Sequence, residues 1–143
     1  MKEIKIFHEC TADAKKIRQE VFVEEQGFQN EFDETDDRAI HCVCYVDGVP
    51  AAVGRTFRQE DGCFAIGRIA VRKPMRKTGL GRTVVLALEE AAKAAGAVET
   101  VLLAQLTAVE FYQTLGYAKA GTIVYDESCP HIQMRKKLSG DLE

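Results

Sequence analysis

Apolar and polar residues alternate in blocks of strand length over the first half of the chain. Residues 2–8 alternate charged with apolar side chains and predict a first strand. Thr11 and Asp13 can cap a helix that continues to about Glu25 and ends or bends at Gly27. Helical spacing gives this helix one buried stripe, formed by Ile17, Val21 and Phe22.

Three strands are predicted between this helix and the longest helix of the chain. They are rich in β-branched and other apolar residues and cover residues 40–47, 50–57 and 63–71. Asp47-Gly48 is typical of a tight hairpin turn between the first two of these strands. Gly54 is a candidate bulge in the second strand, and the polar residues 58–62 are expected to form the next turn.

The clearest helical pattern of the chain runs from Leu80 to a stop at Gly96. Its apolar face is formed by Val84, Val85, Leu88, Ala91, Ala92 and Ala95. Residues 100–106 then form an apolar run that has the length of a strand. Because this run is apolar throughout, it predicts a strand that is buried on both faces.

A capping box formed by Thr107 and Glu110 predicts a second helix, which ends at Gly116. Two closing strands, joined by a turn at residues 126–130, cover residues 117–125 and 131–138. A hairpin meander followed by a β-α-β crossover implies a mixed, mainly antiparallel sheet with one parallel pair and helices on both faces. The predicted fold class is therefore α+β, or mixed α/β, and residues 1–143 are expected to form one domain.

Composition excludes several classes of protein. With 46% hydrophobic and 29% charged residues and a net charge of −3, the chain is globular and does not favour nucleic acid as a partner. No apolar run could span a membrane and the N-terminus lacks the apolar core of a signal peptide, so we expect a cytoplasmic protein. Five cysteines without CxxC spacing favour reduced thiols over disulfides or a metal site. The protein is expected to be a monomer or a homodimer, since the strand at residues 131–138 could lie at a sheet edge.

An abrupt change in charge marks residues 24–37, named here the acidic segment. It holds seven acidic and no basic residues, with Phe28 and Phe32 between them. One interpretation is a solvated loop that two aromatic side chains anchor. The other is a negative surface that attracts a cationic substrate, and the sequence leaves both open.

A basic, glycine-containing loop joins the strand at residues 63–71 to the helix that begins at Leu80. Between Arg72 and Arg82 there are five Lys or Arg and no acid. A strand that leads through glycines into a helix start gathers free backbone N–H groups around one point, and the helix dipole adds positive charge there. Such an arrangement binds anions, above all phosphates.

Two common glycine-loop motifs fit this loop poorly. A Walker P-loop needs Lys followed by Ser or Thr directly after its last glycine, where Arg82 and Thr83 stand. A dinucleotide fingerprint needs Gly or Ala where Val84 stands, and a loop held tightly against the strand. Seven residues separate Val71 from Gly79, which is too many for that motif.

A third motif fits better. Arg76-x-x-Gly79-x-Gly81, which follows a strand ending in Ile69-Ala70-Val71, resembles the acetyl-coenzyme A loop of the GNAT N-acetyltransferases. Further along, Phe111-Tyr112-x-x-Leu115-Gly116-Tyr117 resembles the helix and strand that follow the cofactor site in that family. The order of elements matches over essentially the whole chain. A narrower similarity to the ElaA-type branch rests on Arg18, Val21, Phe22, Val23, Glu25, Gln26, Glu31, Asp33, Asp37, His41, Gly67-Arg68-Ile69-Ala70-Val71, Pro130, His131 and Met134.

The resemblance implies an N-acetyltransferase that uses acetyl-CoA as co-substrate, without a metal. It would pass the acetyl group directly to a primary amine of a small molecule or of a protein lysine or N-terminus. The implied cofactor-binding residues are Ile69, Ala70, Val71, Arg76, Lys77, Thr78, Gly79, Leu80, Gly81, Arg82, Phe111 and Tyr112. Both glycines of the loop are expected where a side chain would hold the backbone off the phosphates. A non-catalytic coenzyme A sensor or scaffold, and another acyl donor such as succinyl-CoA, remain alternatives.

By resemblance, Tyr112 is the general acid that protonates the departing thiolate, and the Val71 N–H donates to the thioester oxygen. Many relatives carry a glutamate on the strand before the loop, but the charged residue between positions 63 and 71 is Arg68. Candidates for the general base or the acceptor side are Glu31, Asp33, His41 and His131. Three arginines could bind a substrate carboxylate or pair with the acidic segment: Arg18, Arg55 and Arg68.

Overall fold

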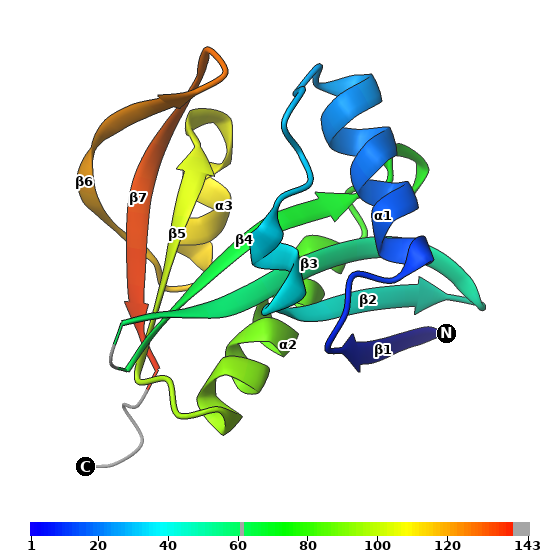
Figure 1. Ribbon diagram of the computed structural model, residues 1–143, viewed down its shortest axis with the longest axis horizontal. Helices are drawn as coiled ribbons and strands as arrows, with labels where there is room; N and C mark the ends of the chain where they lie inside the picture. Colours follow the sequence, from blue (N-terminus) through cyan, green and yellow to red (C-terminus); the bar gives the residue numbers. More distant parts are fainter. Residues whose placement is uncertain (61, 139–143) are drawn as a thin grey trace.

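A seven-stranded, mainly antiparallel sheet forms the frame of the protein. The computed structural model describes residues 1–60 and 62–138. Its strand order is β1-β2-β3-β4-β5-β7-β6, in which β4 and β5 form the parallel pair (Figure 1). The strands are β1 Lys2–Phe7, β2 Ile40–Val46, β3 Val49–Glu60, β4 Cys63–Val71, β5 Glu99–Gln105, β6 Ala118–Asp126 and β7 Cys129–Lys137. The predicted fold class is confirmed.

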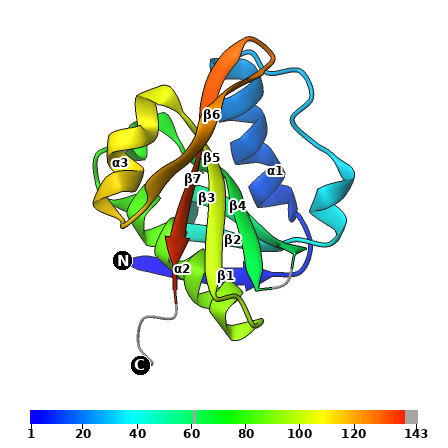
Figure 2. The same cartoon turned by 90° about the vertical axis from the view of Figure 1, so that its left-hand side faces the viewer.

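Helices cover both faces of this sheet, as Figures 1 and 2 show. They are α1 Ala12–Arg18, the π-helix η1 Gln19–Glu25, the 3-10 helices η2 Glu34–Asp37, η3 Lys73–Met75 and η4 Leu106–Ala108, α2 Leu80–Ala94 and α3 Val109–Thr114. Side chains alternate across β2, so that Cys42 and Cys44 pack under α2 while Val43 packs under α1. No disulfide joins any of the five cysteines. None of the helices in residues 1–60 and 62–138 is long and apolar enough to cross a membrane.

The first predicted helix has the expected limits but changes its form part-way. The Thr11 hydroxyl accepts the N–H of Ala14, so the predicted cap is confirmed. After Arg18 the helix widens into the π-helix η1, a form that often occurs at functional sites. Gly27, at φ +81°, then turns the chain out of the helix. The acidic segment that follows contains a short helix, η2, where the sequence predicted a loop.

Four predictions on the later elements need correction. Leu103 of β5 is 57% exposed, although Val101 on the same face is only 3% exposed against Cys63 and Ala65; the strand is therefore buried on both faces at its start and on the face toward α3 alone further along. Thr107 does not cap a helix, because the turn η4 comes first and α3 begins after Ala108 without a side-chain cap.

β7 lies between β5 and β6, so the sheet edge at this end is β6. The turn predicted at 58–62 is shorter, since β3 extends to Glu60, and Asp61 lies outside the described residues.

β4 separates from β5 soon after the two strands pair. The parallel pairing covers only Cys63–Ala65 of β4. Further along, a bulge places Arg68 and Ile69 opposite the single residue Gly54 of β3, so the irregularity expected at Gly54 lies in its partner strand. Arg68 has φ +52°, which bends β4 away from its neighbour. The gap between the two strands is visible in Figure 1.

Gly54 provides a test of this packing. A Cβ atom there would lie 2.6 Å from Ile69 Cδ1, 2.7 Å from Leu88 Cδ1 and 2.8 Å from Val84 Cγ1. Gly54→Ala should therefore lower the free energy of unfolding by about 1–3 kcal/mol, measured by denaturant titration. Gly67→Ala is the matched control, because a Cβ at Gly67 meets no atom within 4 Å. Equal stability of the two variants would contradict the packing described.

Candidate active site

The gap between β4 and β5 leaves part of the β4 backbone without a partner strand. The N–H of Arg72 donates to the carbonyl of Ala51 on the β3 side, at 2.9 Å. Backbone groups point alternately to either side of a strand, so the N–H and C=O of Val71 point into the gap. An extended, amide-containing ligand can pair with such an edge as an additional strand would.

The loop at the end of β4 forms a site suited to an anion. Gly79 is the N-cap of α2, with φ +85° and no side-chain cap. The first N–H groups of α2 therefore remain available to a ligand, with the positive end of the helix dipole behind them. Lys77 and Arg82 are exposed, and neither makes an ion pair within the described residues. The loop can bind a phosphate group.

The two glycines of the loop serve different purposes. Gly79 adopts a left-handed conformation that other residues rarely take. Gly81 lies against an aromatic ring, because a Cβ there would be 3.2 Å from Phe111 Cζ. The sequence predicted that a side chain at Gly81 would hold the backbone off the phosphates, and it did not predict this contact with Phe111. Because Phe111 and Tyr112 form an edge-to-face pair at 4.9 Å, the contact brings the second motif beside the first.

Arg76 is already bound to protein groups. Its Nε donates to the carbonyl of Val71 at 2.9 Å, and its terminal nitrogens donate to both oxygens of Glu25 at 2.7 Å. These bonds hold the pKa of Glu25 below its usual value. Arg72 makes a similar bond to Glu20 at 3.2 Å. Two arginines of the loop thus attach it to the π-helix η1.

Tyr112 lies in the core beneath the gap, 9% exposed, with its ring edge-to-face against that of Tyr117 at 5.9 Å. Burial raises the pKa of its phenol to about 12, so the hydroxyl keeps its proton at neutral pH. Within the described residues, the one fully buried side-chain nitrogen or oxygen without a partner is Arg55 Nε. The Tyr112 hydroxyl also makes no hydrogen bond within the described residues. Because it is not among the fully buried atoms without a partner, its oxygen must be accessible to solvent or to a ligand.

The inner carboxylates of the acidic segment are paired with arginines. Arg18 donates to Glu31 and to Asp36, both at 2.8 Å, although its own side chain is only 2% exposed. Five further contacts complete a network that consists of Arg18, Arg55, Arg68, Glu31, Asp33 and Asp36. The segment is therefore neither a simple solvated loop nor an unpaired negative surface.

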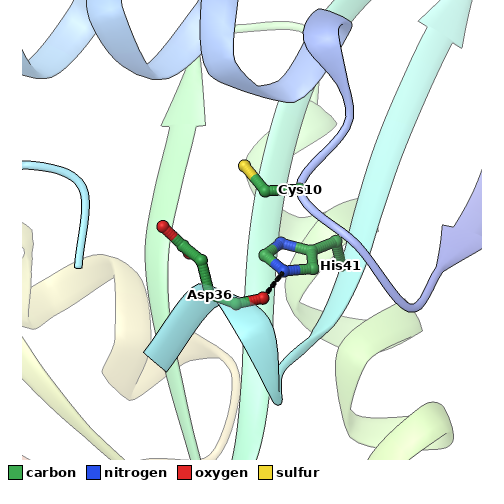
Figure 3. A group of neighbouring side chains, drawn as sticks. All are labelled: Cys10, Asp36 and His41. Atoms are coloured by element: carbon green, nitrogen blue, oxygen red, sulfur yellow. Dashed lines mark hydrogen bonds between the residues drawn. The ribbon is translucent and has the colours of Figure 1, made fainter. Parts of the chain in front are cut away.

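His41 lies at the edge of this network with Cys10 and Asp36 (Figure 3). Its Nε2 donates to the backbone carbonyl of Asp36 at 3.0 Å, and burial lowers the pKa of the imidazole. Ligand atoms of the three residues lie within 4.8 Å of one another, a spacing that could suit a metal ion. However, Arg18 donates to both Cys10 Sγ, at 3.3 Å, and Asp36 Oδ1. The guanidinium supplies the positive charge there, so the cluster fits the ion-pair network better than a metal centre.

His131, at the start of β7, lies apart from this network. Its Nδ1 donates to the carbonyl of Cys129 at 2.9 Å, which leaves Nε2 as the acceptor in the neutral ring. Cys129 lines a polar hollow of about 370 Å³, whose other lining residues are Gln26, Gly27, Phe28, Gln105 and Glu127. The sequence did not indicate this hollow, because its walls come from the end of η1, the end of β5 and the β6–β7 turn. A bond of 2.9 Å from Gln105 to Gln26 joins two of these walls.

Comparison with known proteins agrees with this geometry. The family model of the acetyltransferase (GNAT) domain matches residues 8–138. The chain belongs to the GNAT acetyltransferase family. It is 39% identical over 127 residues to the uncharacterised N-acetyltransferase YjcF of Bacillus subtilis, which covers 87% of this chain and 90% of that protein.

Solved structures show the same GNAT fold. A candidate N-acetyltransferase from Lactobacillus plantarum superposes with a TM-score of 0.85 and is 33% identical, covering 94% of this chain and 98% of the other. Escherichia coli ElaA superposes with a TM-score of 0.83 at 22% identity, covering 96% and 100%. The likeness to ElaA is one of fold. Membership of the family makes this protein an acyltransferase.

Removing the central arginine tests the ion-pair network. Arg18→Met should lower the free energy of unfolding by roughly 3–5 kcal/mol, because it leaves Glu31 and Asp36 buried without their main partner. Denaturant titration measures the change. Lys16→Met, on an exposed position of the same helix, should change stability by less than about 0.5 kcal/mol. A loss of similar size in both variants would contradict the network's role.

Proposed function

We propose that the protein transfers an acetyl group from acetyl-CoA directly to a primary amine. The observation that carries this proposal is the convergence of three features: the unpaired edge of β4, the uncapped start of α2 and the accessible hydroxyl of Tyr112. Family membership supports acetyl transfer in general. A Bacillus subtilis acetyltransferase of the same fold, with a TM-score of 0.77 and 17% identity, has been crystallised in complex with CoA.

The pyrophosphate of the cofactor would lie at the start of α2. Backbone N–H groups from Lys77 to Arg82 would donate to it, and the exposed side chains of these two residues add positive charge. The amide-containing pantetheine arm would then pair with residues 69–71 of β4. This arrangement directs the thioester toward the end of the gap near Tyr112.

The chemistry follows from the groups at that end. The amine nitrogen attacks the thioester carbon, a new C–N bond forms, and the oxygen becomes an oxyanion that the Val71 N–H can stabilise. The carbonyl then re-forms as the C–S bond breaks, and Tyr112 donates its proton to the departing thiolate. The nitrogen, positively charged after its attack, gives up a second proton to solvent, and the phenolate takes up a proton from solvent. A phenol whose pKa is raised to about 12 is protonated throughout the neutral range, as this step requires.

The acceptor amine must first lose a proton, and the four candidate bases differ in availability. Burial raises the pKa of Glu31, but Arg18 and Arg68 both contact its carboxylate. Asp33 and His41 are likewise engaged, the first with Arg55 and the second with the Asp36 carbonyl. His131 keeps Nε2 available as an acceptor and lies two residues from Cys129, which lines the polar hollow. We therefore assign the base to His131.

Tyr112→Phe tests the general acid. The variant should lose roughly 100-fold or more in kcat, because the thiolate must leave without a proton, while its affinity for acetyl-CoA stays nearly unchanged. Thiol release is measured with polyamines, aminoglycosides, amino acids and lysine peptides, and affinity by calorimetry. Tyr125→Phe, at a 71% exposed tyrosine, is the control. Unchanged turnover in Tyr112→Phe would contradict the role of Tyr112 as general acid. If the natural protein binds acetyl-CoA but releases no thiol with any of these amines, a coenzyme A sensor or scaffold is favoured.

Glu25→Gln tests the charge balance of the cofactor loop. Glu25 neutralises Arg76 beside the proposed pyrophosphate site, so its removal should make coenzyme A binding about threefold tighter. Calorimetry at low and high salt would show the gain shrinking as salt screens the charges. Glu3→Gln, on an exposed residue of β1, removes the same charge far from the loop and should leave the affinity unchanged. Weaker binding in Glu25→Gln would mean that the pair instead orients the loop for the cofactor.

A further inference from the structure

The polar hollow contains a single charged side chain. Its lining combines two glutamines, a phenylalanine, a glycine and a cysteine with the carboxylate of Glu127. Within the described residues, Glu127 makes no ion pair with a lysine or arginine. The nearby arginines Arg18, Arg55 and Arg68 are engaged by the acidic segment. The hollow therefore carries a net negative charge.

Two backbone bonds hold this carboxylate in place. Glu127 accepts the N–H of Gln29 at 2.8 Å and that of Asn30 at 2.9 Å, one on each oxygen. Glu127 and Ser128 adopt φ +50° and +77°, so a tight turn between β6 and β7 directs the side chain toward these groups. The next residue, Glu31, is fixed by its buried ion pairs. Both sides of the contact are thus anchored.

The bound carboxylate retains capacity for a ligand. A carboxylate offers about four lone-pair sites, and the two backbone bonds use one on each oxygen. A positively charged group can therefore bind Glu127 without displacing Gln29 or Asn30. At about 370 Å³ the hollow is at the small end of the range for small-molecule sites. Phe28 offers an apolar surface for a short hydrocarbon chain, and the amides of Gln26 and Gln105 can bond polar groups.

We propose that Glu127 binds an ammonium group of a small-molecule acceptor other than the amine that is acetylated, and so selects an acceptor that carries a second positive charge. This inference rests on the proposed function, because it names the class of acceptor at the same site. According to this proposal, one carboxylate in the β6–β7 turn, that of Glu127, selects a cationic ligand. The carboxylates of the acidic segment do not line the hollow, and arginines engage Glu31, Asp33 and Asp36.

The test uses two probes of similar shape and different charge, butan-1-amine and butan-1-ol. Each is titrated into the full-length, isotopically labelled protein without cofactor, and binding is followed by NMR at the side-chain amides of Gln26 and Gln105. We expect the cationic amine, and not the alcohol, to shift these signals. Glu127→Gln should weaken binding of the amine about fivefold, the upper range for an exposed ion pair. Added salt should weaken amine binding to the natural protein and not to this variant.

Glu24→Gln is the matched control, because it removes the same charge from an exposed residue outside the hollow and should leave amine binding unchanged. The backbone signals of Gln29 and Asn30 report whether Glu127→Gln preserves the turn, because the one glutamine oxygen can accept only one of the two N–H groups that the two carboxylate oxygens accept. Equal binding of both probes, no binding of the amine, or equal affinity in the natural protein and Glu127→Gln would each overturn the proposal. Because no cofactor is present, failure of coenzyme A binding or of turnover is a separate result.

Discussion

The early separation of β4 from β5 is the constraint on which the site depends. Parallel pairing stops at Ala65, and the bulge at Arg68 and Ile69 turns the rest of β4 away. This leaves the polar groups of Val71 unpaired on the side of the gap, which is costly for a central strand unless a ligand or side chain satisfies them. Arg76 already bonds the Val71 carbonyl, and the N–H remains for a ligand. A sheet with uninterrupted pairing would have no such edge beside the start of α2.

The buried ion-pair network fixes the acidic segment to α1, β3 and β4. Removing charged groups from water costs several kcal/mol for each ion unless partners and hydrogen bonds replace the water. Arg18 meets this condition, since its guanidinium bonds Glu31, Asp36 and the sulfur of Cys10. The network therefore fixes the path of the acidic segment and neutralises its inner carboxylates, Glu31, Asp33 and Asp36. The carboxylate that lines the polar hollow is that of Glu127, which the fixed segment holds through two backbone N–H groups.

Local patterns predicted those features that depend on neighbouring residues. The periodicity after Leu80 and the hairpin at Asp47-Gly48 both follow from local backbone preferences, and the structure has them. Contacts between distant segments could not be predicted in this way. Gly81 contacts Phe111, thirty positions further along the chain. Arg76 is bound by Glu25, whose acidic segment suggested a solvated loop or a negative surface but no partner in the cofactor loop. The polar hollow is built from three separate segments, so no local pattern in the sequence indicates it.

The π-helix η1 connects the two halves of the site. At its end, Glu25 holds Arg76 of the cofactor loop, and the next residue, Gln26, bonds Gln105 at the end of β5. These two contacts lie one peptide bond apart, so the cofactor loop and the wall of the polar hollow are attached to adjacent residues. The same short segment is thus in contact with the groups that would hold the cofactor and with those that would hold the acceptor. Because η1 ends at Glu25, the path of this π-helix sets the position of both contacts.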